Sequence, residues 1–105
     1  MSDDLFNLIY NKSLDLLSRR EHSRKELKEK LSLRFQSDDM IQTVLDKLET
    51  NNLINELRFA EAYTRSRKRK GFGPKKIFYE LSAKGVEESV SNQVILDEGN
   101  WDKVA

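Results

Sequence analysis

Apolar residues at intervals of three and four positions run along most of this sequence, and that spacing predicts helices. The first such stripe is interrupted by Lys12 and Ser13 and comprises Leu5, Leu8, Ile9, Leu16 and Leu17. One proline and four glycines in 105 residues leave too little turn punctuation for a domain built of strands. The sequence therefore predicts an all-α fold.

Capping residues place a second helix. Ser23 and Glu26 have the spacing of a capping box, in which each side chain accepts a hydrogen bond from the other residue's backbone N–H. The helix that follows is expected to bury Leu27 and Leu31.

A third helix is predicted next along the chain. Ser37 or Asp38 can cap its start, and the asparagines at 51 and 52 tolerate the left-handed conformation that ends a helix. Its buried stripe is expected to comprise Met40, Ile41, Val44, Leu45 and Leu48.

The second half of the sequence repeats this plan. Asn55 can cap a helix that stops before residues 71–74, which read Gly-Phe-Gly-Pro. Pro74 suits the first turn of the next helix, and Gly85 suits its left-handed end. Val86, Val90, Val94 and Ile95 give a last helix, which Gly99 can close. The side chains expected to face inward are Phe59, Ala60, Ala62, Tyr63, Ile77, Phe78, Leu81, Val86, Val90, Val94 and Ile95.

The two halves match at a constant offset of about fifty residues. The matching pairs include Ile9 with Phe59, Met40 with Val90, Val44 with Val94, and residues 23–31 with residues 73–81. This pattern predicts tandem three-helix repeats, each helix-turn-helix-like, in an elongated array because such modules pack mainly on their neighbours. We expect a first repeat at 5–54, a second at 55–99, and the truncated start of a third at 100–105.

The net charge of +1 conceals strong local charges. Residues 19–34 carry +4 and residues 58–84 carry +7, whereas residues 1–18, 35–57 and 85–105 carry −2, −4 and −4. The basic segments recur in step with the helical repeat. They are either a solvated helical face or a surface for a polyanion, such as a phosphate backbone or an acidic protein.

The second basic segment favours a polyanion more strongly than the first. Seven Lys and Arg side chains fall between residues 65 and 76 with no acid among them, and like charges this close in sequence repel one another. Lys28, Lys30 and Arg34 extend the first cluster. The basic residues that we predict to bind a partner or nucleic acid are Arg19, Arg20, Arg24, Lys25, Arg58, Arg65, Arg67, Lys68, Arg69, Lys70, Lys75 and Lys76.

Two aromatic residues beside the second cluster can stack on a nucleic-acid base. They are Phe72, between two glycines, and Tyr79, on the helix that follows. Packing between the helices that it joins is the alternative for Phe72. Phe78 shares a face with Ile77 and Leu81, and we expect it in the core.

The sequence offers no constellation of catalytic residues. It has no cysteine, and its one histidine, His22, is expected to lie half-exposed at a helix entrance, although it can also titrate or touch phosphate. No Gly-rich phosphate loop and no long apolar run is present. We therefore expect a protein that is not an enzyme, carries neither metal nor cofactor, and is soluble and cytoplasmic.

Two strings of residues carry a resemblance to a known family. One reads R-R-E-H-S-R-K-E-L at residues 19–27, and the other reads R-F-A-E-A-Y at residues 58–63. Further matching positions are Ser18, 44–48, 55–57, Arg67, 71–74, Ile77, 80–81 and 84–85. From about residue 10 to Trp101, the sequence resembles the RecX family of bacterial recombination regulators.

The resemblance implies a fold and a function. RecX proteins consist of tandem three-helix repeats, bind the RecA filament on single-stranded DNA, and inhibit the recombinase, ATPase and LexA-coprotease activities of RecA. They have no catalytic residues and need no cofactor. The resemblance places the contact with the nucleoprotein filament at Arg19, Arg20, Arg24, Arg58, Arg67 and the basic residues between 71 and 76.

Family members usually have three repeats, whereas this sequence ends six residues into what resembles the third. It is either a fragment or a naturally shortened form, and we expect a monomer whose grip on RecA lacks the contribution of the third repeat. A helical module that binds DNA directly is the alternative function, and a structural scaffold that binds neither RecA nor DNA is a further one.

Overall fold

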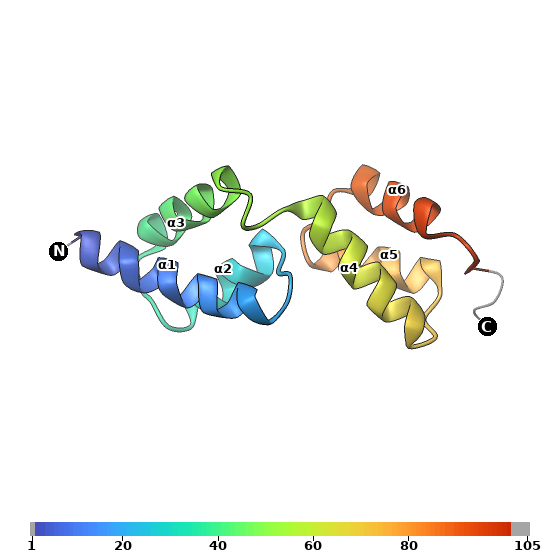
Figure 1. The fold of residues 1–105 in the computed structure, drawn as a ribbon, viewed down its shortest axis with the longest axis horizontal. Coiled ribbons are helices and arrows are strands. Elements are labelled where there is room, and N and C mark those ends of the chain that lie inside the picture. The colour runs from blue at the N-terminus through green and yellow to red at the C-terminus, as the bar shows by residue number, and fades with distance from the viewer. Residues whose placement is uncertain (1, 102–105) are drawn as a thin grey trace. The chain divides into compact units, whose positions relative to one another are not determined.

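The computed structural model describes residues 2–101. Its helices are α1 (Ser2–Arg19), α2 (Arg24–Ser32), α3 (Asp38–Thr50), α4 (Glu56–Arg69), α5 (Pro74–Ala83) and α6 (Glu88–Glu98), shown in Figure 1. The described part of the chain contains no strand. The prediction of an all-α fold is therefore confirmed.

The chain divides into two compact units, Met1–Asn55 and Glu56–Ala105. The first unit contains α1, α2 and α3, and the second contains α4, α5 and α6. Within each unit every helix contacts the other two, so each is a three-helix bundle with its own core.

The core of the first unit is formed by all three of its helices. Its buried apolar side chains are Ile9, Leu27, Leu31, Ile41, Val44, Leu45, Leu48 and Ile54. Ser13, which interrupts the stripe of α1, is also buried, and its hydroxyl donates a 2.8 Å hydrogen bond to the carbonyl of Ile9. Leu8 differs from the expected stripe because it lies on the outer face of α1 and is 60% exposed.

The core of the second unit is smaller. Its buried apolar side chains are Phe59, Ala60, Ile77, Leu81, Val86 and Val94. The prediction that Phe78 joins this core is wrong: Phe78 is only half-buried, and its ring meets the exposed ring of Tyr79 at 73°. Successive side chains of a helix point in different directions, and Phe78 directly follows Ile77. Phe78 therefore lies off the face of α5 that Ile77 and Leu81 share.

The caps predicted at Ser23 and Ser37 are present, whereas the cap predicted at Asn55 stays a prediction. Ser23 Oγ accepts from the Glu26 N–H at 3.1 Å, and Glu26 Oε1 accepts from the Ser23 N–H at 3.1 Å, which completes the capping box. Ser37 caps α3 by accepting from the Met40 N–H at 3.3 Å. Pro74 occupies the first turn of α5, where its missing N–H leaves no bond unmade.

The end of α5 corrects one further expectation. Gly85 has a left-handed φ of 85°, and its N–H donates to the Ser82 carbonyl while the Val86 N–H donates to the Leu81 carbonyl. This pair of hydrogen bonds is a Schellman motif. It turns Val86 inward from the loop, before α6 begins at Glu88, so Val86 is a core residue but not part of the last helix.

The same motif closes α4, where Gly71 has a φ of 92°. The Phe72 N–H donates to the Arg67 carbonyl at 3.2 Å, and the Gly71 N–H donates to the Lys68 carbonyl at 2.9 Å. A Schellman motif brings the residue after the left-handed position back against the last turn of the helix. Phe72 is thereby placed beside Arg67.

The predicted third repeat begins where the described residues end. Trp101 packs against the second core, and its Nε1 donates a 2.7 Å hydrogen bond to the Ile95 carbonyl. Residues 102–105 lie outside the described residues, so the third repeat stays a prediction.

Replacing Leu81 by Ala is expected to destabilise the second unit by about 2–5 kcal/mol, because the side chain is fully buried and leaves a cavity. Urea unfolding followed by Trp101 fluorescence measures this loss, since Trp101 packs against the same core. The matched control is Leu96→Ala, because Leu96 is 73% exposed. Equal midpoints for the two variants would contradict the burial of Leu81.

Candidate partner-binding surface

Arg67, the central residue of the second basic cluster, is held inside its own unit. Its Nε and Nη2 donate to the Glu80 carboxylate at 2.9 and 2.8 Å, which ties α4 to α5. The guanidinium carbon lies 3.8 Å from the centre of the Phe72 ring, and Tyr63 donates its hydroxyl hydrogen to the same carboxylate at 3.1 Å. Arg67 is therefore a structural clasp between two helices.

These hydrogen bonds keep both partners ionised. The bond from Arg67 is the main reason that the pKa of Glu80 lies below its ordinary value, and the bond to Glu80 raises the pKa of Arg67. Because Glu80 accepts from two donors, its charge is compensated within the unit.

Lys68 and Arg65 face the last helix of the same unit. Lys68 Nζ donates to the Gly99 carbonyl at 2.6 Å, and it lies 3.8 Å from the Glu98 carboxylate and 5.2 Å from the centre of the Trp101 ring. Arg65 Nε lies 3.8 Å from Glu98, although this side chain remains 61% exposed. Lys68 therefore belongs to the contact between α4 and the segment that ends α6.

The remaining cations of this cluster surround the turn from α4 to α5. Arg69, Lys70 and Lys75 are exposed, and within residues 2–101 none of their side chains forms a hydrogen bond or an ion pair. We call these three residues the basic tip. Lys76 lies beside it, 3.9 Å from Glu80 and mostly exposed.

A structural role for the basic tip is limited. Arg69 lies in the last turn of α4, where a cation interacts favourably with the helix dipole. Lys75 lies in the first turn of α5, where a positive charge is unfavourable for the same reason. The intramolecular contacts in the described chain therefore do not explain this cluster of charge.

Most predicted cations of the first unit are engaged by acids. Arg24 is bound by Glu49, by Asp46 at 2.8 Å and by Gln42 at 2.8 Å, which joins α2 to α3. Arg19 lies 3.0 Å from Asp15 on its own helix.

Other basic residues are engaged less directly. Lys28 lies 4.0 Å from Asp38 across the loop between α2 and α3. Lys25 and Arg58, both predicted site residues, also have interaction partners in their surroundings. Arg34 and Lys47 are exposed, and the described part of the chain gives their side chains neither hydrogen bond nor ion pair.

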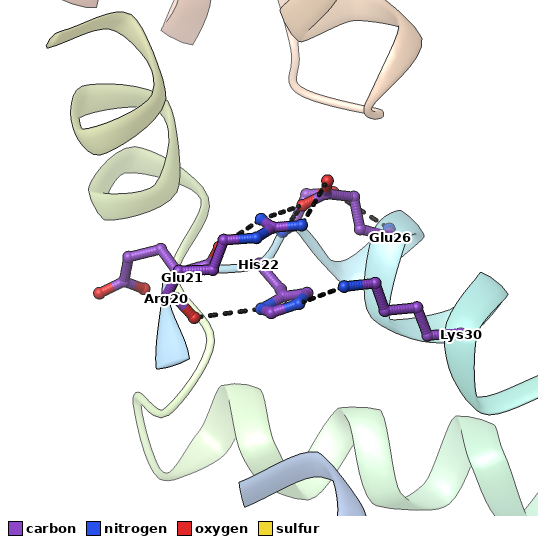
Figure 2. A network of polar contacts seen from close by, with 6 residues as sticks. Arg20, Glu21, His22, Glu26 and Lys30 are labelled. Atoms are coloured by element: carbon purple, nitrogen blue, oxygen red, sulfur yellow. Dashed lines mark hydrogen bonds and ion pairs between the residues drawn. The ribbon is translucent and has the colours of Figure 1, made fainter. Parts of the chain in front are cut away.

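Arg20 is engaged in a polar network at the junction of α1 and α2, which Figure 2 shows. Its two terminal nitrogens lie 3.2 and 3.3 Å from the Glu26 carboxylate, and one of them also donates to the Glu21 carbonyl at 2.8 Å. The cap residue Glu26 thus compensates Arg20 while it holds the start of α2.

His22 is the second element of this network, and the expectation that it is half-exposed is wrong. The side chain is 2% exposed. Its Nδ1 lies 3.1 Å from the Arg20 carbonyl, and its Nε2 lies 2.9 Å from Lys30 Nζ (Figure 2). A carbonyl can only accept and an ammonium can only donate, so these contacts require a neutral ring protonated on Nδ1. Its burial separates it from any phosphate outside.

The offset between the halves contains a signal for this burial. His22 corresponds to Phe72 at an offset of fifty, and Phe72 packs against the core of its own unit. No such correspondence predicts which acids bind the arginines. Glu80 and Glu49 lie on different helices from Arg67 and Arg24, and only the fold brings each pair together.

The described residues contain no group of three or more metal-binding side chains. No helix in residues 2–101 combines the length and the apolar character needed to cross a membrane.

Comparison with known proteins assigns each unit to one family. Residues 10–48 match the family model for the first three-helix domain of RecX, and residues 55–95 match the model for the second. A regulatory protein RecX from Pseudomonas putida (strain W619) is 40% identical over 90 residues, covering 85% of this chain and 58% of the relative. The chain belongs to the RecX family.

Other relatives agree with this assignment. A regulatory protein RecX from Halorhodospira halophila is 42% identical over 90 residues, covering 85% of the chain and 56% of the relative. The crystal structure of RecX from Lactobacillus salivarius superposes with a TM-score of 0.83 at 31% identity, over 99% of this chain and 66% of that one. The chain spans just over half the length of the curated RecX relatives it matches.

The neutral His22 makes stability depend on pH. Burial is the main reason that its pKa lies below 6.5, so the unfolded chain binds a proton at higher pH than the folded chain does. Stability is therefore expected to fall as the pH decreases from 6.5 toward the lower, folded-state pKa, by at most about 1.4 kcal/mol per pH unit from this group.

Urea unfolding at about pH 7.5 and about pH 5.5 tests this expectation. The control is His22→Asn, which has no titrating ring and is the matched variant because His22 is the only histidine. The natural chain is expected to lose more stability between the two pH values than the variant. Equal losses would contradict the burial of a neutral His22.

Reversing Arg67 to Glu is expected to lower the melting temperature, because it places a second carboxylate against Glu80 and removes the guanidinium from Phe72. Reversing Arg69 to Glu is the matched control, since Arg69 is exposed and two positions away. Circular dichroism at increasing temperature measures both. Equal melting temperatures for the two variants would show that the contacts of Arg67 with Glu80 and Phe72 do not stabilise the second unit.

Proposed function

We propose that this chain is a regulator of RecA that binds RecA filaments on single-stranded DNA and inhibits their recombinase, ATPase and coprotease activities. The observation that carries the proposal is the basic tip of a chain that belongs to the RecX family. Relatives named "Regulatory protein RecX" support a regulatory role.

The basic tip suits a polyanionic partner for a physical reason. Arg69, Lys70 and Lys75 repel one another, and the acids that pair with the rest of the cluster already contact other cations: Glu80 contacts Arg67, and Glu98 contacts Lys68. A surface of this kind attracts a phosphate backbone or an acidic protein surface and gains stability when that partner neutralises it. A RecA filament on single-stranded DNA contains such a phosphate backbone.

Direct action on nucleic acid is the second candidate, because the basic tip can contact phosphates without RecA. The two candidates differ in their preferred target. A direct DNA binder binds bare single-stranded DNA as well as it binds the filament, and its affinity falls steeply with salt. A filament regulator binds RecA, single-stranded DNA and ATP together far better than DNA alone.

The test is a titration into a RecA–single-stranded DNA ATPase assay. The natural chain is expected to slow ATP hydrolysis, and the double reversal Arg69→Glu with Lys70→Glu is expected to require at least about tenfold more protein for half inhibition. The matched control is Arg34→Glu with Lys47→Glu, which changes the net charge equally on exposed residues of the other unit.

Two results would contradict the proposal. If the natural chain leaves the ATPase activity and the stability of the filament unchanged at saturation, RecA is not its partner. If the two double reversals weaken inhibition equally, net charge matters and the basic tip does not.

A further inference from the structure

An exposed aromatic ring lies on α5 beside the basic tip. Tyr79 is 61% exposed, and within residues 2–101 its hydroxyl has no hydrogen-bond partner. It lines an open hollow together with Lys75, Lys76, Glu80 and Ala83. Lys75, Tyr79 and Ala83 follow one another at intervals of four, so they form a single stripe along the helix.

The ring of Tyr79 is more accessible for stacking on a base than the ring of Phe72. Phe72 packs against the second core, and the Arg67 guanidinium lies 3.8 Å from the centre of its ring. The described ring contact of Tyr79 is with Phe78, at 5.8 Å and close to perpendicular, so no other ring of the described chain lies parallel on it. Of the two aromatics that the sequence suggests for stacking, Tyr79 is the exposed one, whereas Phe72 is partly buried.

The charge of the hollow is positive. Glu80 is its one acidic lining residue, and its carboxylate already accepts from Arg67 and Tyr63. Lys75 has no acidic partner in the described chain, and Lys76 is 57% exposed. An exposed aromatic ring next to the unpaired ammonium of Lys75 and the largely exposed ammonium of Lys76 matches a nucleotide, which has a flat base and a negative phosphate.

The first unit lacks this arrangement. At the offset of fifty residues, Tyr79 corresponds to Glu29 and Lys76 corresponds to Glu26. An acid at the position of the ring would repel phosphate. The hollow is thus a property of the second unit and not a consequence of the repeated fold.

We propose that the hollow on α5 binds one nucleotide of single-stranded nucleic acid, with the base stacked on Tyr79 and the adjoining phosphate paired with Lys75 and Lys76. This inference adds a nucleotide-binding site to the proposed function. It rests on that function because the function supplies single-stranded DNA as the ligand. The base contact distinguishes this site from the basic tip, which can bind any polyanion.

Fluorescence anisotropy with a labelled oligothymidine tests the stacking contact. Tyr79→Ala is expected to weaken binding by about 5- to 150-fold, the range found for losing one base–aromatic stack. Tyr79→Trp is expected to retain binding, because it preserves the flat ring. Leu96→Ala is the matched control, since Leu96 is a large exposed apolar residue on another helix.

An abasic oligomer of the same length separates the base from the phosphates. The natural chain is expected to bind the abasic oligomer more weakly than oligothymidine, and Tyr79→Ala to bind the two alike. The inference is overturned if Tyr79→Ala binds oligothymidine as the natural chain does, if it loses equal affinity for both oligomers, or if the natural chain binds neither.

The RecA ATPase assay keeps this inference separate from the proposed function. If the natural chain inhibits RecA and Tyr79→Ala retains full affinity for oligothymidine, the regulator stands and the stacking site is refuted. If the base-dependent loss appears and RecA is unaffected, the stacking site stands and the proposed regulator is refuted.

Discussion

The small core of each three-helix unit is the constraint on which the rest of the structure depends. Among the side chains that the structure describes, eight buried apolar ones hold the first unit and six hold the second. A chain of about fifty residues buries a smaller fraction of its surface than a larger domain does, so contacts at the rim of the core matter more. In each unit an arginine supplies such a contact: Arg24 joins α2 to α3, and Arg67 joins α4 to α5. Arg67 also covers the ring of Phe72, so it packs as well as pairs.

Local rules predicted most of the helical framework from the sequence. The capping box at Ser23, the cap at Ser37 and the first-turn proline at 74 depend on residues within one turn of each other, and each is present in the structure. The left-handed Gly85 is equally local, because only the absence of a β-carbon makes that conformation inexpensive. Val86 was predicted as helical because its spacing to Val90 fits, whereas the hydrogen bonds that end α5 hold it in the preceding loop.

Charge pairing could not be predicted in the same way. Within residues 65–76 the sequence shows only cations, yet the fold brings Glu80 and Glu98 to them from other helices. The sequence therefore places Arg67 on a free basic face, although in the structure its ion pair with Glu80 joins α4 to α5. His22 was misjudged for a related reason: its two polar partners, the Arg20 carbonyl and Lys30, are supplied by the fold, and together they make burial of a neutral ring acceptable.

The basic residues thus divide into two groups. Paired cations such as Arg24 and Arg67 join helices within a unit, whereas the basic tip and the mostly exposed Lys76 beside it are the residues that we propose to bind a partner. Because each phosphate contact on a single strand releases counterions, the salt dependence of binding counts the cations that take part. The most direct measurement is the slope of log affinity against log salt concentration for a single-stranded oligonucleotide. Three to four contacts predict a slope between about −2 and −3. A slope of about −6 or steeper would show that the paired arginines and lysines also bind phosphate, and a slope near zero would show that the basic tip does not; either result would contradict the account.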